Sequence, residues 1–199
     1  GYTFAGWNDG STTSNAGTSV SVTSNKIYVA QWSAQSFTIS YSGNTPTSGS
    51  VTSGSYVAGG VPYAIAANGF TKDGYTFAGW KDASNNSYTV GAGYSTAANL
   101  ALIAQWTASS FVVSYNGNGS TEGNAPSSGT LTTGTAFNAS DNTGSLIKSG
   151  YTFAGWNTSA AGTGINVAVG GVVTTTSNIT LYAKWTIISP LITFNKGTA

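Results

Sequence analysis

The sequence predicts a mainly β protein made of small modules repeated in tandem, with little or no helix. A seven-residue motif, GYTFAGW, begins at Gly1, Gly74 and Gly150, so a similar unit returns after 73 and then 76 residues. A hydrophobic segment ending in tryptophan follows each copy, as YVAQW, LIAQW or LYAKW. Both motifs are rich in β-branched and aromatic residues that alternate with period two, which indicates strands.

The strand that ends in tryptophan has a preferred inner face in all three copies. Alternate positions leading to Trp32, Trp106 and Trp185 are mostly apolar, whereas the intervening positions drift toward polar residues. We therefore expect the tryptophan face to lie in the core.

Within GYTFAGW, strict alternation would place the phenylalanine and the tryptophan on opposite faces of the strand. A β-bulge at the glycine between them would bring both rings inward. The predicted bulges lie at Gly6, Gly79 and Gly155.

The motifs divide the chain into four expected segments. Residues 1–35 read as the C-terminal half of a repeat module, 36–108 and 109–188 as two full modules, and 189–199 as the start of the next repeat. Each full module opens on a third motif, SFTISYSGN or SFVVSYNGN, of which LITFNKGT from Leu191 is a weaker copy. Clusters of Gly, Asn, Ser and Pro between the strands predict tight turns.

One segment carries a helix signal. VPYAIAANG, residues 61–69, has a proline near a first turn and Asn-Gly at its end, and its counterpart from Thr135 lacks this pattern. A helix is therefore the weaker expectation there.

We expect the motif aromatics to form the dry interior of each module. Large rings contribute much of the burial available to a unit of this size. A stacking platform for sugars is the alternative, but recurrence at a strand end in every unit favours the core. The predicted core residues are Tyr2, Phe4, Trp7, Trp32, Tyr75, Phe77, Trp80, Trp106, Tyr151, Phe153, Trp156 and Trp185.

Composition excludes several function classes. Only 6% of the 199 residues are charged and the net charge is +1, so nothing indicates binding to nucleic acid or to an anionic membrane. The 28 serines and 30 threonines supply the polar surface instead. No apolar run reaches the roughly 18 residues of a membrane span, so we expect no membrane insertion in this segment.

The absent residue types bear on location and origin. Cys, His and Met are all missing, which excludes disulfides, thiolate sites and imidazole ligands and suits an exported protein in an oxidising environment. Without an initiating Met or a signal peptide, we expect a mature or excised piece of a longer chain.

We predict no catalytic, cofactor-binding or metal-binding residues. Without His and Cys, the candidates for acid–base chemistry are five carboxylates, at Asp9, Asp73, Asp82, Glu122 and Asp141. Asp9 and Asp82 each follow a motif tryptophan by two residues, but the third copy has Thr158 there. NDGST and DNTGS are the nearest calcium-like stretches, each with one Asp, and turn hydrogen bonding is the expected role.

One lysine falls on the expected core face. Lys26 aligns with Leu100 and Ile179, so we expect its stem to cover apolar surface rather than to form a crosslink.

GYTFAGW followed some 25 residues later by a strand ending in AQW or AKW resembles the Listeria-Bacteroides repeat, also called the internalin B-repeat family. The resemblance covers almost the whole chain, in two full copies and two partial ones. It implies small β-grasp-like modules of about 75 residues, strung in tandem within large bacterial surface proteins as stalks and adhesins. It implies no catalytic residues, and the low charge departs from the family.

The expected function is a non-enzymatic stalk, spacer or filament segment of a bacterial surface protein, located outside the cell at its surface or wall. Its partners would be neighbouring repeats of the same chain or adjacent subunits of a fibre. The alternative is an adhesive module that binds glycan or a host surface through exposed aromatics or Thr-rich faces. If the chain is a fragment, the preceding sequence would supply the strands missing from residues 1–35. If it is a natural subunit, a neighbour's Leu191–Ala199 strand would complete the half module by β-augmentation.

Overall fold

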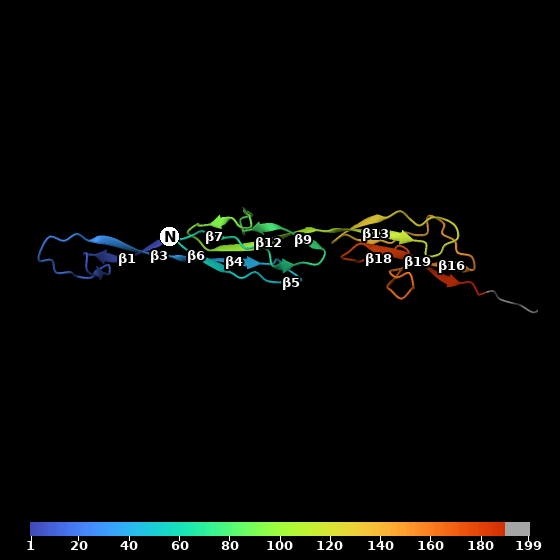
Figure 1. The fold of residues 1–199 in the computed structure, drawn as a ribbon, viewed down its shortest axis with the longest axis horizontal. Helices are drawn as coiled ribbons and strands as arrows, with labels where there is room; N and C mark the ends of the chain where they lie inside the picture. Colours follow the sequence, from blue (N-terminus) through green and yellow to red (C-terminus); the bar gives the residue numbers. More distant parts are fainter. Residues whose placement is uncertain (190–199) are drawn as a thin grey trace, which may run out of the picture. The chain divides into compact units, whose positions relative to one another are not determined.

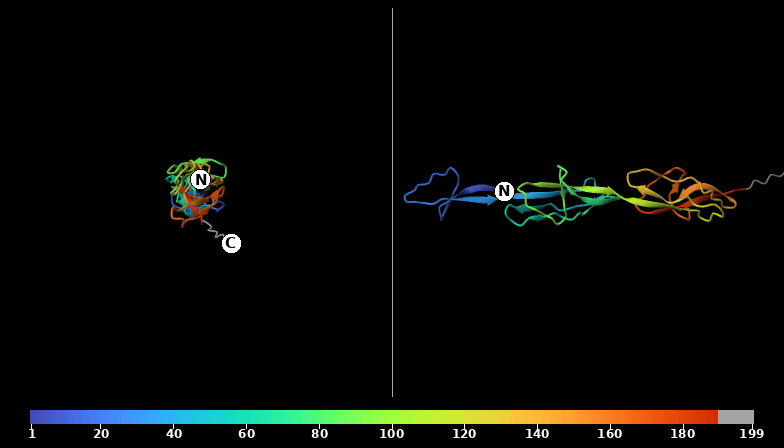
Figure 2. Two further views of the ribbon diagram at one scale, coloured as in Figure 1. Left: turned by 90° about the vertical axis from the view of Figure 1, so that its right-hand side faces the viewer. Right: turned by 90° about the horizontal axis from the view of Figure 1, so that it is seen from above.

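The computed structural model describes residues 1–189, which form strands and loops but no helix (Figures 1 and 2). The mainly β prediction is therefore confirmed. VPYAIAANG contains the short strand β7 (Tyr63–Ala64) in place of a helix. The predicted start of a further repeat lies, from residue 190 on, outside the described residues.

The chain forms two compact units. One consists of Gly1–Lys72 and Phe77–Thr107, and the other of Asp73–Thr76 with the residues from Ala108 onward.

The first unit contains a five-stranded sheet in the order β10-β9-β12-β4-β6. Its strands are β4 (Ser36–Ser42), β6 (Gly54–Val57), β9 (Tyr75–Lys81), β10 (Ser87–Tyr88) and β12 (Leu100–Ala108). Two small sheets accompany it. They pair β7 with β11 (Gly93–Tyr94), and β5 (Ser48–Gly49) with β8 (Phe70–Thr71).

The second unit repeats the arrangement, with strand order β14-β13-β19-β16-β17. Its strands are β13 (Ser110–Asn116), β14 (Gly129–Thr132), β16 (Tyr151–Asn157), β17 (Asn166–Val167) and β19 (Ile179–Ile187). A small sheet pairs β15 (Phe137–Asn138) with β18 (Val172–Val173), as β7 pairs with β11.

The first and last strands of each full module are parallel neighbours at the centre of the sheet. Leu100 of β12 lies opposite Ile39 of β4, and Ile179 of β19 lies opposite Val113 of β13. A parallel pair requires a crossover connection. If the four long strands of a module are numbered in chain order, they lie across the sheet in the order 2-1-4-3, which is the β-grasp order. Here the crossover, from β6 to β9 or from β14 to β16, has no helix.

The N-terminal segment is half of this arrangement. It contains β1 (Tyr2–Asn8), β2 (Thr13–Ser14) and β3 (Val29–Ala34) in the order β2-β1-β3, which corresponds to β10-β9-β12. Among the described residues, β3 has no parallel neighbour. We call residues 1–35 the half module.

A β-bulge in the GYTFAGW strand brings phenylalanine and tryptophan to one face, as predicted. The register shifts between Phe4 and Gly6 in β1, and between Phe153 and Trp156 in β16. The glycines Gly6, Gly79 and Gly155 have φ values of 142°, 134° and 98°, which side-chain-bearing residues rarely adopt.

Each full module has one apolar core. In the first it is built on Ile39, Leu102 and Trp80, with Tyr41 and Phe70 among the rings packed against it. In the second it is built on Val113, Leu181 and Trp156. The tryptophan face of β12 and β19 is the buried face, so the predicted register of this strand is confirmed.

The predicted core residues fall into three groups. Trp80 and Trp156 are 1% and 0% exposed. The partly buried rings that pack against the cores are Phe77, Trp106, Phe153 and Trp185.

The remaining predicted core residues lie outside the cores, and these expectations need correction. The exposed ones are Tyr2, Phe4, Trp7, Trp32 and Tyr151, while Tyr75 is half-buried outside both cores. Phe4, Trp7 and Trp32 are exposed because the half module has no strand equivalent to β4 to cover them.

The motif tyrosine has a different role, at the joint before the next module. The Tyr2 hydroxyl donates to the Ala58 carbonyl at 3.1 Å, and the Tyr75 hydroxyl lies beside Gly134. Tyr151 is the motif tyrosine of the second full module, and the Lys148 ammonium lies 4.8 Å from its ring centroid.

Replacing the same motif tryptophan in a full module and in the half module is expected to have unequal costs. Trp80→Ala empties a closed core and should lower the free energy of unfolding by about 3–5 kcal/mol. Trp7→Ala, at a site 46% exposed, should cost about 1 kcal/mol or less. Urea unfolding followed by circular dichroism measures both, and equal losses would contradict the assigned cores.

Candidate functional site

The open face of the half module is the candidate site. Its centre is a ring cluster in which Phe4 lies 5.3 Å from Trp7 and 5.6 Å from Trp32, both edge-to-face. The same cluster recurs in the first full module, where Phe77 lies 5.0 Å from Trp80 and 5.9 Å from Trp106. The geometry of the half module is thus that of a core without its cover.

The full modules show what normally covers these rings. Tyr41 of β4 contacts Trp80 with ring centroids 4.9 Å apart, and Tyr115 of β13 contacts Trp156 at 4.8 Å. Phe70 adds a further ring against Trp80. In the half module, Trp7 borders a cavity of about 370 Å³.

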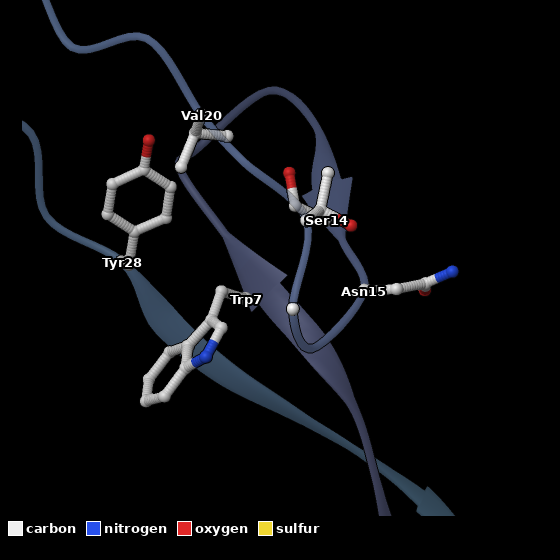
Figure 3. A pocket seen from close by; sticks show the side chains of 7 residues that line it. Trp7, Ser14, Asn15, Val20 and Tyr28 are labelled. Carbon is white, nitrogen blue, oxygen red and sulfur yellow. The ribbon is translucent and has the colours of Figure 1, made fainter.

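This cavity lies beside the exposed tryptophan of β1 (Figure 3). Trp7, Val20 and Tyr28 line its apolar side, while Ser14 and Asn15 contribute polar groups. The figure shows Trp7 and Tyr28 on the same side of the strands. The cavity can therefore accept an apolar side chain of another segment.

The full modules and the half module also differ in the hydrogen bonds of their second motif tryptophan. The Trp106 and Trp185 indoles donate to the Gly43 and Gly117 carbonyls, just after the first strand, at 2.8 and 3.1 Å. The equivalent Trp32 indole has no acceptor within the described half module. A segment that buried this face would have to supply one.

The other motif tryptophan binds the crossover. The Trp80 indole donates to the Ala66 carbonyl at 3.0 Å, and the Trp156 indole donates to the Ser140 carbonyl at 2.7 Å. The peptide N–H groups of these two crossover residues donate to tyrosine hydroxyls of the first strand, each at 2.8 Å. One crossover residue is thus held at both its N–H and its C=O.

Burial of this tyrosine changes its acidity. Desolvation is the main cause that raises the pKa of Tyr41 to about 12, so its hydroxyl stays protonated and neutral throughout the physiological range.

The two motif-associated carboxylates close turns. The Asp9 carboxylate accepts from the backbone N–H groups of Ser11 and Thr12 at 3.1 and 2.9 Å. The Asp82 carboxylate accepts from the backbone N–H groups of Ser84 and Asn86, both at 2.9 Å. These bonds confirm the predicted turn role of NDGST.

The turn hydrogen bonds lower both carboxyl pKa values. Lys26, and then the backbone donors of the turn, hold the pKa of Asp9 far below its ordinary value. The Asn86 side chain is the main cause that lowers the pKa of Asp82, and the Tyr88 hydroxyl contributes. Both groups are therefore ionised hydrogen-bond acceptors at neutral pH.

The third copy of the turn replaces the carboxylate with amide and hydroxyl groups. Asn157, 1% exposed, accepts from the Ser159 and Gly164 N–H groups through its side-chain oxygen. The Thr158 hydroxyl accepts from the Ile165 N–H at 2.9 Å. A charged group is thus dispensable at this turn.

Lys26 differs from its expected role. It is exposed and forms an ion pair with Asp9, which also raises the pKa of Lys26, instead of covering apolar surface. The reason is the missing neighbour of β3, since Leu100 and Ile179 at the same position face a first strand.

Sequence reasoning missed a set of asparagines that join the first and last strands. The side-chain oxygens of Asn99 and Asn178 accept from the Thr38 and Val112 N–H groups, each at 2.8 Å. Their shared place in AAN and TSN, directly before the tryptophan strand, is the signal that could have identified them. The half module has Asn25 at this place.

Residues 1–189 contain neither a metal-binding cluster nor a membrane-spanning helix. No group of three or more His, Cys, Asp or Glu side chains is close enough to hold a metal ion there. That part of the chain also contains no helix long and apolar enough to cross a membrane.

The fold defines a protein of tandem β-modules that share one aromatic core design. Its residues 1–31, 37–105 and 111–184 match the Listeria-Bacteroides repeat domain, and the chain belongs to this family. The predicted family is confirmed.

Two proteins of Evansella cellulosilytica are similar to the chain. One, named "Putative Gly-rich membrane protein", is 32% identical over 166 residues, which are 76% of this chain and 18% of that protein. Another, named "Putative membrane protein", is 28% identical over 194 residues, which are 93% of this chain and 28% of that protein. The chain thus spans less than a third of the length of either relative.

Removing the tyrosine hydroxyl that holds the crossover is expected to destabilise the second module. Tyr115→Phe leaves the Ser140 N–H without its acceptor and should cost about 1–2 kcal/mol of unfolding free energy. Tyr182→Phe is the matched control, because no hydrogen bond of that hydroxyl is found in the described residues. Chemical denaturation measures both, and equal losses would show that the crossover bond contributes nothing.

Acid is expected to weaken the turn closed by Asp82. Because its folded pKa is depressed, the stabilisation is complete above the unfolded value of about 3.9 and is lost as pH falls below it. Thermal midpoints measured between about pH 2 and pH 7 should therefore fall less on acidification in Asp82→Asn than in the unaltered chain. Identical pH profiles would contradict the assigned role.

Proposed function

We propose that the chain is a non-enzymatic, load-bearing spacer segment of a larger bacterial cell-surface protein. The observation that carries the proposal is the parallel pairing of the first and last strands in each full module, β4 with β12 and β13 with β19. The family match and the names of the two relatives support a place in the cell envelope. The lack of Cys and Met suits an extracellular position.

Parallel end strands determine how a module responds to tension. When the chain is pulled from both ends, force enters a module through its first strand and leaves through its last. Because these strands are adjacent and parallel, pulling slides one along the other and loads the ladder hydrogen bonds between them together. Peeling an antiparallel pair would break the bonds one after another.

The joints add to this resistance. A single residue separates the last strand of one module from the first strand of the next, Gln35 after β3 and Ser109 after β12. The Ser109 N–H donates to the Gly74 carbonyl at 2.8 Å, and its own carbonyl accepts from the Thr133 N–H at 3.0 Å. Gln35 makes the same two bonds, with Gly1 and Ala58.

A glycan-binding adhesin is the less favoured reading. Trp80 and Trp156 are buried, and Trp106 and Trp185 are partly buried against the cores, so the full modules present no open indole platform. The exposed indoles of the half module occupy positions that belong to the core elsewhere.

Single-molecule stretching tests the load-bearing role. The full chain, held at its two ends, is expected to show two unfolding events, each lengthening the tether by about 20–25 nm, as expected for a module of this length. Since the chain has no cysteine, Ser114→Cys with Ser128→Cys gives a matched control geometry that peels β13 from β14. The two hydroxyl oxygens lie 3.3 Å apart, so the thiols are kept reduced until each carries a pulling handle, which prevents a disulfide between them.

The control geometry decides between the outcomes. Pulling from the chain ends should require at least about twice the force of peeling, because more hydrogen bonds break at once. Equal forces in the two geometries would contradict the load-bearing function.

A further inference from the structure

We propose that the second full module binds small phenols in a cavity at a place that the first full module fills with a tyrosine of its own. The cavity has a volume of about 420 Å³, with Leu131 and Val173 as its floor and five threonines among its walls. This binding goes beyond the load-bearing role and does not depend on it, since a spacer can carry tension with or without a ligand.

The first full module shows which side chain normally occupies this place. Tyr56 of β6 lies opposite Phe37 of β4. Its counterpart, Leu131 of β14, lies opposite Phe111 of β13. The Tyr56 ring is buried, with its centroid 5.6 Å from that of Phe37 and 5.8 Å from that of Tyr94. Leu131 thus replaces a tyrosine that packs between two other rings.

The second of these rings is also absent from the second module. Tyr94 lies opposite Tyr63, whereas its counterpart Val173 lies opposite Phe137. Two tyrosines in contact therefore correspond to two aliphatic side chains, Leu131 and Val173, which are each 4% exposed. Because both are shorter than a tyrosine, space remains above them. Apolar cavities produced by shorter side chains can bind small aromatic molecules.

The walls of the cavity are built up where its centre is reduced. Four wall positions carry larger side chains than their counterparts in the first module. They are Thr133, Val172, Thr174 and Thr176, in place of Ala58, Gly93, Ser95 and Ala97. A concave site of this volume, mostly apolar with a few polar groups, is typical of small-molecule binding.

The Thr175 carbonyl can accept a hydrogen bond from the ligand. Thr175 and Thr96 both lie three residues before the joining asparagine of their module. The Thr96 carbonyl accepts from the Tyr56 hydroxyl and from the Ala98 N–H. In the second module the Ser177 N–H donates to the Thr175 hydroxyl instead, at 3.1 Å. No donor to the Thr175 carbonyl is found in residues 1–189.

These features specify an uncharged aromatic ring that carries a hydroxyl group. The ring would cover Leu131 and Val173, and its hydroxyl would donate to the Thr175 carbonyl as Tyr56 donates to Thr96. No charged side chain lines the cavity, which favours a neutral ligand. A sugar ring fits less well, because several of its hydroxyls would lie over the apolar floor without hydrogen-bond partners.

Nuclear magnetic resonance of the ¹⁵N-labelled full chain, titrated with p-cresol to about 5 mM, tests the proposal. Amide signals of residues 131–135 and 172–176 should shift with a dissociation constant of about 0.1–1 mM, which is ordinary for a ligand of this size. In p-methylanisole a methyl ether replaces the hydroxyl. This compound should bind at least about tenfold more weakly, because the Thr175 carbonyl loses its donor.

Two variants place the same new side chain inside and outside the cavity. Leu131→Tyr restores the residue of the first module and should abolish the p-cresol shifts, because its ring occupies the site. Thr130→Tyr adds a tyrosine at the neighbouring exposed position and should change the dissociation constant by less than about threefold. Circular dichroism checks that each variant folds. Val173→Tyr fills the same cavity from β18 and gives an independent second test.

Several results would overturn the proposal. They are an absence of shifts in residues 131–135 and 172–176, shifts confined to the half-module cavity beside Trp7, equal affinity for p-cresol and its ether, and unchanged binding in folded Leu131→Tyr or Val173→Tyr. None of these results would alter the outcome of the stretching experiment, so the load-bearing role stands or falls separately.

Discussion

The contact between the motif tryptophan and the tyrosine of the first strand is the interaction on which each full module depends. In the second module the rings of Tyr115 and Trp156 lie 4.8 Å apart, and both side chains bond to the backbone of Ser140. Three segments distant in sequence thereby meet at one point: the first strand, the GYTFAGW strand and the crossover. A helix in the crossover would satisfy its own backbone groups. Here the Tyr115 and Trp156 side chains form the hydrogen bonds of the backbone N–H and C=O of Ser140.

The same interaction explains why one sequence motif has two environments. GYTFAGW forms the same bulged strand in its first and third copies, because the bulge needs only the glycine and the neighbouring strand. Whether its tryptophan is buried depends on a tyrosine of the first strand, some 40 residues earlier in the chain, that packs against the indole. In the half module no such tyrosine lies among the described residues, so Phe4, Trp7 and Trp32 form a correct cluster with one side open.

Local pattern was sufficient to predict the strands, the bulge and the inner face of the tryptophan strand. Alternation and glycine placement act over a few residues, so they are visible in the sequence. Burial was predicted less well, because it depends on partners far away. Tyr2 and Tyr75 look like core residues but lie at joints, and the stem of Lys26 was expected on an apolar face that has no cover. The joining asparagines, such as Asn99, were missed since one polar residue before a strand resembles an ordinary turn residue.

The one-residue joint has a consequence for how such chains can change length. The Ser109 N–H donates to the Gly74 carbonyl and the Ser109 carbonyl accepts from the Thr133 N–H. An inserted or deleted residue would therefore leave one of these backbone groups without its hydrogen-bond partner. The loop after the first strand is free of this restriction and already differs between modules, spanning residues 43–53 in one and 117–128 in the other. Evolution can therefore vary the loops of these repeats readily, while array length should grow or shrink by whole modules.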